Sequence, residues 1–246
     1  MSSSQLERPL GYAEKFIVDR ILTGEYEIGQ PIPAERELAD TTGVTRPTLR
    51  EAIRRLESEG WIAVHHGKRT IVRDFWREGN LGVLTRVIQH QGGIRPSFIM
   101  NLLDFRLLIA PTYTRDAIEY NADSVLERLS DMPKPHADPA EYAAFDWALH
   151  RDLAVYSANV IFPLILNGFS DYYQQMARRY FSRAEARDSS HQFYVALQQF
   201  ALVGDSGGAF RMTEIVMRES LDHWHAVSGS SPPHPEENDE KASDAP

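Results

Sequence analysis

The stretch "TRPTLREAIRRLESEGWIAVHHGKRTIVR", residues 45–73, decides the fold of the first part of this chain. In its first half, apolar residues recur at helical spacing up to Gly60, and Thr45 and Pro47 are typical of a helix start. In its second half, two short runs of alternating residues flank Gly67, where a hairpin would turn. The stretch therefore predicts a helix followed by a β-hairpin.

Two shorter helices are expected before this stretch. Residues 8–24 carry apolar side chains at helical spacing, and residues 34–43 form a second short amphipathic segment, each ending in a glycine. A turn-rich connection with Pro31 and Pro33 separates the two segments. Helix, helix, tight turn, helix and hairpin is the order of a winged helix-turn-helix domain, whose third helix reads DNA.

Charge is distributed unevenly along the chain. The 246 residues have a formal net charge of −9, yet residues 1–77 hold 12 Lys/Arg and 12 Asp/Glu, so the acidic excess lies in residues 78–246. Residues 45–73 contain seven basic and three acidic residues. On charge alone, a solvated helix face is the more ordinary interpretation. Combined with the order of elements, the local basic patch favours DNA as the partner.

The rest of the chain is expected to be helical. From about residue 80 onward, segments with helical periodicity are separated by Pro, Gly, Asn and Asp, without strand-type alternation or a glycine-rich phosphate loop. The predicted fold class is therefore mainly α, with an N-terminal winged helix-turn-helix domain and a C-terminal all-α bundle of six or seven helices.

Composition predicts five parts. They are a flexible N-terminus (1–8), the winged helix-turn-helix domain (9–74), a linker (75–81), the all-α domain (82–227) and a disordered acidic tail (228–246).

Several classes of protein are excluded by composition. The chain has no cysteine, so neither disulfides nor thiolate zinc sites can form. No apolar run approaches the length that spans a bilayer, and the N-terminus lacks the charged segment and apolar core of a secretory signal. A cytoplasmic location is expected.

The segment "PIPAERELADTTGVTRPTLREAIRRLESEGWI", residues 31–62, resembles the DNA-binding domain of GntR-type regulators. Further on, "HHGKRTIVRDFW", "NLLDFR", "LILNGF", "RRYFSRAEAR" and "ESLDHW" are similar to the FadR group, the acyl-CoA-responsive regulators of fatty-acid metabolism. The resemblance covers about residues 9–226. It implies a homodimer that binds palindromic operator DNA, represses fatty-acid degradation genes and activates unsaturated fatty-acid synthesis genes. It also implies release from DNA by long-chain acyl-CoA, with no cofactor besides this effector.

The resemblance places DNA contacts on eight positions. They are Arg36 in the second helix, Thr45, Arg46, Thr48 and Arg50 at the start of the third, and His66, Gly67 and Lys68 at the hairpin tip. Pro47 departs from the FadR pattern, in which threonine is usual, and removes a hydroxyl that could bind phosphate.

The resemblance also places an acyl-CoA pocket in the helical domain. Its expected ligand-binding residues are Leu103, Arg106, His150, Tyr180, Met217, Ser220 and Trp224. An apolar tunnel with a few polar groups suits a thioester with a long chain. Two positions depart from FadR: Met217 replaces a glycine against the acyl chain, and His150 replaces a phenylalanine. The bulkier Met217 is expected to change chain-length preference or affinity, whereas His150 also has a second interpretation as a metal ligand.

Two other functions remain as alternatives. Asp146 and His150 stand four residues apart on one helix, and metal-binding GntR relatives that sense a small carboxylate add two histidines, here replaced by Tyr194 and Met217. His191 and His223 are close in sequence to these two positions, so a metal site remains an alternative.

An enzyme is the other alternative. It is disfavoured because residues 78–246 contain only two lysines, Lys134 and Lys241, and no nucleophile–base arrangement. The chain is therefore expected not to be an enzyme.

Overall fold

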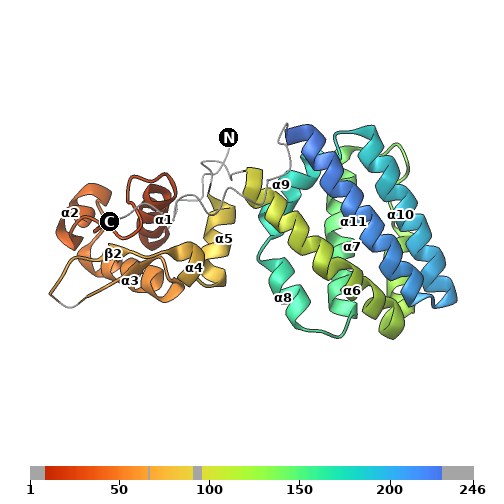
Figure 1. Ribbon diagram of the computed structural model, residues 1–246, viewed down its shortest axis with the longest axis horizontal. Coiled ribbons are helices and arrows are strands. Elements are labelled where there is room, and N and C mark those ends of the chain that lie inside the picture. The colour runs from red at the N-terminus through yellow and green to blue at the C-terminus, as the bar shows by residue number, and fades with distance from the viewer. Residues whose placement is uncertain (1–8, 66, 91–95, 229–246) are drawn as a thin grey trace, which may run out of the picture. The chain divides into compact units, whose positions relative to one another are not determined.

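The computed structural model describes residues 9–65, 67–90 and 96–228, and the chain divides into two compact units, residues 1–94 and 95–246 (Figure 1). The first unit contains helices α1 (Pro9–Leu22), α2 (Glu35–Thr42), α3 (Arg46–Glu59), α4 (Phe75–Glu78) and α5 (Leu81–Gln89) and strands β1 (Ile62–Ala63) and β2 (Ile71–Val72). The predicted flexible N-terminus lies outside the described residues, as does the predicted tail beyond residue 228.

Helix α3 begins and ends where the sequence predicts. The Thr45 hydroxyl accepts the Thr48 N–H at 3.3 Å, and Pro47 occupies the first turn. The helix ends at Gly60, whose φ of 97° lies in the left-handed region and whose N–H bonds to the Leu56 carbonyl at 3.2 Å. One face is fully buried against α1 and α2, and its residues are Leu49, Ala52, Ile53 and Leu56.

The wing is present but shorter than the sequence pattern indicates. Strands β1 and β2 pair antiparallel with Ile62 opposite Val72, and each has two residues. A further bridge joins Pro31 to Ile71, and the Ile32 N–H bonds to the Thr70 carbonyl at 2.9 Å. The turn-rich connection before α2 therefore extends the sheet on one side. The winged helix-turn-helix fold is confirmed.

The compact units differ from the predicted linker at residues 75–81 and from the predicted start of the bundle at residue 82. Both α4 and α5 belong to the first unit. The ring of Phe75 packs against Trp61 with centroids 4.8 Å apart, and the Asn80 N–H bonds to the Glu59 carbonyl at 3.0 Å. These contacts cover the C-terminal end of α3, so this segment completes the first unit.

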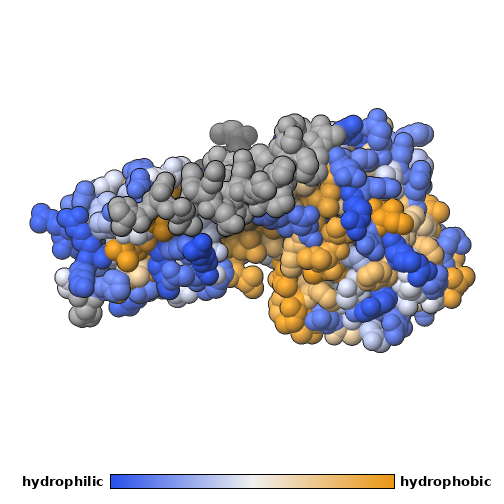
Figure 2. Space-filling view, viewed as in Figure 1, coloured by the Kyte–Doolittle hydropathy of each residue, from blue (hydrophilic) through white to orange (hydrophobic). Residues whose placement is uncertain are grey.

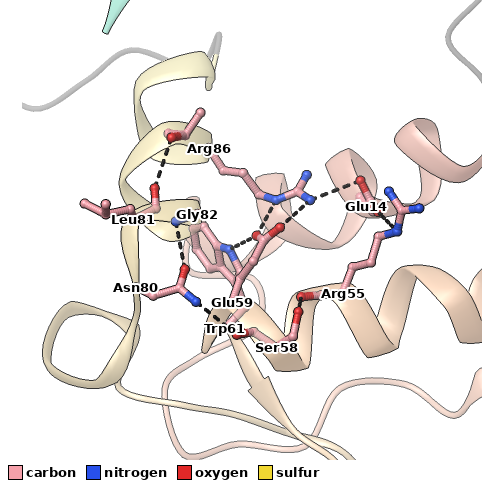
Figure 3. A network of polar contacts seen from close by, with 10 residues as sticks. Glu14, Arg55, Ser58, Glu59, Trp61, Asn80, Leu81, Gly82 and Arg86 are labelled. Carbon is pink, nitrogen blue, oxygen red and sulfur yellow. Dashed lines mark hydrogen bonds and ion pairs between the residues drawn. The ribbon is translucent and has the colours of Figure 1, made fainter. Parts of the chain in front are cut away.

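A partly buried ionic cluster fixes α5 to α3 and α1 (Figure 3). Arg86 holds both carboxylate oxygens of Glu59, at 2.5 and 2.8 Å, and reaches Glu14 at 3.1 Å. The indole N–H of Trp61 donates to Glu59 at 3.1 Å. Burial lowers the pKa of Arg86, but the hydrogen bonds and charges of Glu59 and Glu14 more than offset this and raise it. The guanidinium is therefore the cation that the two carboxylates share, and Arg55 is a second, more distant partner of Glu14 at 3.7 Å.

Asn80 makes the second connection in this region. Its side chain donates to the Ser58 carbonyl at 3.0 Å and accepts the Gly82 N–H at 2.7 Å, which caps α5 (Figure 3). The backbone of α3 and the start of α5 are thereby linked through one side chain.

A Gly60→Ala substitution should strongly destabilise the first unit. A Cβ there would lie 2.9 Å from the Glu78 carbonyl oxygen and 2.9 Å from Gly79 Cα, both backbone atoms, and would also suffer the strain of the left-handed conformation. We expect a loss of about 3 kcal/mol in the free energy of unfolding in urea. Gly24→Ala is the matched control: its φ is 81° with open space around it, so only the strain of about 1 kcal/mol applies. Equal losses for the two variants would contradict the proposed clash.

The second unit is an all-α bundle. It contains α6 (Pro96–Ser130), α7 (Pro139–Tyr156), α8 (Ile161–Asn167), α9 (Ser170–Tyr180), α10 (Ala184–Val203) and α11 (Ser206–Ser228). Helix α6 packs along α7, α10 and α11 and is kinked at Asn121, where φ is −147°. These six helices of the described residues, one of them kinked, agree with the predicted six or seven. The confirmed fold class is mainly α.

The largest fully buried side chains of the second unit are aromatic. Tyr113, Tyr142, Phe181, Phe193 and Tyr194 are all at most 1% exposed. No helix among the described residues is long and apolar enough to cross a membrane.

Candidate functional site

The start of α3 presents the predicted DNA-contacting side chains at the surface. Thr45, Arg46 and Arg50 are exposed, and Thr48 is partly buried with its hydroxyl 2.9 Å from that of Thr45. Arg50 is bound to Glu35 on α2 at 2.8 Å, whereas Arg46 has no ion-pair partner among the described residues. Arg46 is therefore the cation at this helix start that can meet DNA without first losing a protein partner.

Side chains, rather than amides, form most of this polar surface. The Thr48 N–H is taken by Thr45 Oγ1, the Leu49 N–H by the Thr45 carbonyl at 2.9 Å, and Pro47 has no N–H. The amide-based phosphate site expected at a helix N-terminus is thus reduced here. Figure 2 shows that the visible face of the first unit around α2 and α3 is largely hydrophilic.

The remaining predicted DNA contacts lie on α2 and the wing. Arg36 is exposed on α2. Gly67 and Lys68 are exposed at the hairpin tip, where the Lys68 N–H bonds to the His65 carbonyl at 3.1 Å. His66 lies outside the described residues.

The second unit encloses a cavity of about 130 Å³ among α6, α7, α9, α10 and α11. All seven predicted ligand-binding residues line it: Leu103, Arg106, His150, Tyr180, Met217, Ser220 and Trp224. Most of the other lining side chains are apolar, among them Ile99, Leu102, Phe105, Ile109, Trp147, Phe169, Met176 and Val216. A cavity of this size holds a ligand segment comparable to benzene, so a long chain must widen it.

Asp146 is the charged centre of the cavity wall. Its carboxylate accepts the Tyr194 hydroxyl at 2.8 Å and the Tyr173 hydroxyl, and it lies 3.4 Å from Nη2 of Arg106. Burial raises the pKa of Asp146, but the Arg106 guanidinium and the two hydroxyls hold it below its ordinary value. The carboxylate is therefore ionised and internally compensated.

His150 stands beside this carboxylate as a neutral ring. Its Nδ1 lies 2.8 Å from the Tyr113 hydroxyl, and its Nε2 lies 3.7 Å from Asp146 Oδ1. Burial, and next the charge of Arg106, lower the pKa of His150 to about 3. The imidazole therefore carries no charge near neutral pH.

The other polar residues that line the cavity differ in the hydrogen bonds that they make and in their protonation. The Ser220 hydroxyl donates within α11 to the carbonyls of Val216 and Met217, at 3.1 and 2.9 Å. Burial raises the pKa of Tyr180 to about 12, so its hydroxyl keeps its proton. The indole N–H of Trp224 is buried without a hydrogen-bond partner among the described residues.

The predicted ligand residues left out Tyr113 and Tyr173, which complete the polar cluster. Each looks like an ordinary core aromatic in its helix, because its role depends on His150 and Asp146, 37 and 27 residues away along the chain. Only an explicit search for hydroxyl partners of the Asp146–His150 pair could have found them.

The metal alternative finds no ligand set in the described part of the chain. No group of three or more His, Asp or Glu side chains there could hold a metal ion. Tyr194 donates its hydroxyl to Asp146, and Arg106 supplies positive charge beside the same carboxylate. His223 instead packs against the ring of Tyr180, with centroids 6.2 Å apart.

A winged helix-turn-helix unit with an exposed arginine on its third helix, joined to a helical unit with an internal cavity, defines a DNA-binding transcriptional regulator. Two family models cover most of the chain. Residues 13–72 match "Bacterial regulatory proteins, gntR family", and residues 73–234 match "FadR C-terminal domain". The chain belongs to the GntR family and, within it, to the FadR group. It is therefore a regulator and not an enzyme.

Named relatives agree with this assignment. The chain is 40% identical over 194 residues to a fatty acid metabolism regulator protein of Shewanella pealeana, covering 79% of this chain and 81% of the relative. It is 36% identical over 228 residues to the protein of the same name from Cronobacter sakazakii, covering 92% of this chain and 95% of the relative.

A solved structure supports the fold. It belongs to Lar, described as controlling expression of the Listeria monocytogenes agr system, and matches with a TM-score of 0.51 at 16% identity, covering 91% of this chain and all of that one.

Proposed function

We propose that this regulator binds palindromic operator DNA as a homodimer and is released by long-chain acyl-CoA. In this role it represses fatty-acid degradation genes, activates unsaturated fatty-acid synthesis genes and acts in the cytoplasm. The observation that carries the proposal is the mainly apolar cavity of the second unit, which is lined by all seven residues that the FadR resemblance assigns to acyl-CoA.

Charge next to the cavity supports a ligand with phosphate groups. The second unit lies in the acidic part of the chain, yet α9 ends in the exposed residues Arg178 and Arg179, directly before Tyr180. The guanidinium carbon of Arg179 lies 5.6 Å from the ring centroid of Trp224, which lines the cavity. An acyl chain in the cavity would therefore place the phosphates of coenzyme A near cations.

Release from DNA requires that acyl-CoA bind one state better than another. The cavity must widen to admit a long chain, and the flexible side chains of Met176 and Met217 line it. A wider second unit is thus the state that the ligand favours, and ligand binding is coupled to loss of DNA affinity if that state holds the winged units out of register with the half-sites.

Oleoyl-CoA should weaken operator binding by about ten-fold or more, within the usual range of allosteric coupling. The measurement is fluorescence anisotropy of labelled operator DNA titrated with the full chain, with and without saturating ligand. Oleate and free coenzyme A serve as ligand controls, since each supplies half of the proposed interaction. Unchanged operator affinity at saturating oleoyl-CoA would refute the proposed response.

The Trp224→Ala variant identifies the site of this response. It should bind operator as tightly as the natural chain but need several-fold more oleoyl-CoA for release, because a large buried contact with the ligand is lost. Loss of operator binding as well would indicate a folding defect, which circular dichroism detects.

A further inference from the structure

The cavity contains a polar pair that an unsubstituted acyl chain would leave unused. Tyr113 and His150 both line it, are 0% and 1% exposed, and are joined through the hydroxyl and Nδ1 at 2.8 Å. Their surroundings are aromatic: Phe162 packs edge-on to Tyr113, and Phe193 stacks on His150. The pair is therefore a polar group in a largely aromatic part of the cavity wall, with the charged Asp146 as a neighbour 3.7 Å from His150.

The protonation of this pair follows from its neighbours. A neutral imidazole has one N–H and one acceptor nitrogen. Asp146 Oδ1 lies 3.7 Å from Nε2 and favours the proton there, so Tyr113 donates to Nδ1. The Nε2–H is then a buried donor with no hydrogen-bond partner among the described residues. Leaving such a donor unpaired costs free energy, which a ligand acceptor would recover.

The pair lies away from the proposed coenzyme A end of the cavity. Trp224, beside Arg179, packs in one apolar cluster with Met100 and Leu103 of α6. Tyr113 follows Leu103 by ten residues on the same helix, which corresponds to roughly 15 Å along its axis. A chain that enters from the Trp224 side therefore reaches His150 well beyond its thioester.

Resting on the acyl-CoA response proposed above, we propose that this cavity selects acyl chains that carry a hydroxyl group where they pass His150. The hydroxyl oxygen would accept the His150 Nε2–H, and its own proton would face the Asp146 carboxylate, 3.7 Å from that nitrogen. A keto oxygen could satisfy only the first of these. The effector class is then a hydroxylated long-chain acyl thioester.

The arrangement of His150 and Asp146 can discriminate between hydroxylated and unsubstituted acyl chains. A purely apolar pocket discriminates only weakly for or against an added hydroxyl, whereas a site built to hydrogen-bond that hydroxyl rejects the analogue that lacks it. His150 and Asp146 supply the donor and the acceptor on successive turns of α7, four residues apart. Their spacing is fixed by the helix, so the required position of the hydroxyl along the chain is fixed as well.

The test is isothermal titration calorimetry of the full chain with octadecanoyl-CoA and with hydroxyoctadecanoyl-CoAs that carry the hydroxyl near the thioester, at mid-chain or near the methyl end. All ligands are used below their micelle concentrations. We expect one hydroxylated isomer to bind about ten-fold or more tightly than octadecanoyl-CoA. His150→Phe should abolish or reverse this preference. Tyr113→Phe should reduce it, because without the Tyr113 hydroxyl donating to Nδ1 the His150 proton is no longer held on Nε2.

Met217→Leu is the matched control. It reshapes the same cavity without changing hydrogen bonding, so the affinities for hydroxylated and unsubstituted chains should move together and their ratio should stay within about two-fold. Thermal melts confirm that each variant is folded. A ratio near one in the natural chain, or a ratio that survives His150→Phe, overturns the inference while leaving the acyl-CoA response intact. No binding of any acyl-CoA overturns both.

Discussion

An Arg46→Ala variant should bind operator DNA about 100-fold more weakly than the natural chain, because each half-site of the proposed palindrome would lose one arginine contact worth about 1–3 kcal/mol. Arg46 is the exposed arginine at the start of α3 that no described residue holds in an ion pair. Oleoyl-CoA binding should be unchanged, since the cavity is formed by the second unit. Anisotropy for DNA and calorimetry for ligand check the two halves of this expectation.

Arg218→Ala is the control for the lost charge. Arg218 is an exposed arginine of α11 that pairs with Glu214 at 3.0 Å, so its removal changes net charge equally without touching the DNA-binding unit. The salt dependence of binding then separates two roles for Arg46. A lower slope with unchanged sequence preference indicates a phosphate contact, and relaxed preference at one base pair indicates base recognition. Equal affinity of the two variants would exclude Arg46 from the interface.

Replacing Arg86 with methionine should lower the free energy of unfolding of the first unit by about 2–3 kcal/mol, because it removes charged hydrogen bonds from an ion pair that is only partly buried. Glu14 and Glu59, whose side chains are 8% and 20% exposed, would lose the cation that they share, and among the described residues only Arg55, 3.7 Å from Glu14, would remain nearby. Methionine keeps the apolar stem of the arginine, so the loss reflects charge rather than a cavity. Urea unfolding followed by tryptophan fluorescence measures it.

Arg77→Met provides the comparison for this variant. Arg77 lies on α4, its side chain is 86% exposed, and its contact with Asp74 is long at 3.6 Å, so its loss should change stability by less than about 0.5 kcal/mol. Adding Glu59→Gln to Arg86→Met should restore part of the stability, because one uncompensated buried charge is then removed. A small effect of Arg86→Met alone would show that the cluster is hydrated rather than buried.

Local patterns were sufficient for most elements of this fold, although α4 lies where the sequence predicted a linker. Thr45, Pro47 and Gly60 mark both ends of α3 because capping depends on residues adjacent in sequence. The wing also follows from its alternation, although sheet pairing extends over only two residues in each strand. The bundle follows from helical periodicity.

Contacts between residues far apart in the sequence could not be predicted from local patterns. The amphipathic pattern of α5 shows that one face is buried but does not show which unit buries it; that depends on Arg86 meeting Glu59, 27 residues earlier. The cavity residues were named through family resemblance, and their roles in binding remain predictions. The tyrosines around Asp146 and His150 required the tertiary structure, because hydroxyl partners leave no periodic signal in sequence.

The position of α5 bears on how such regulators could exchange their sensor domains during evolution. The two family models meet between residues 72 and 73, whereas the physical boundary lies after residue 94. Recombination at the sequence boundary would separate Arg86 from Glu59 and Phe75 from Trp61. A new sensor would then have to bring its own arginine and aromatic residue, so helices α4 and α5 and the DNA-binding domain should be inherited together.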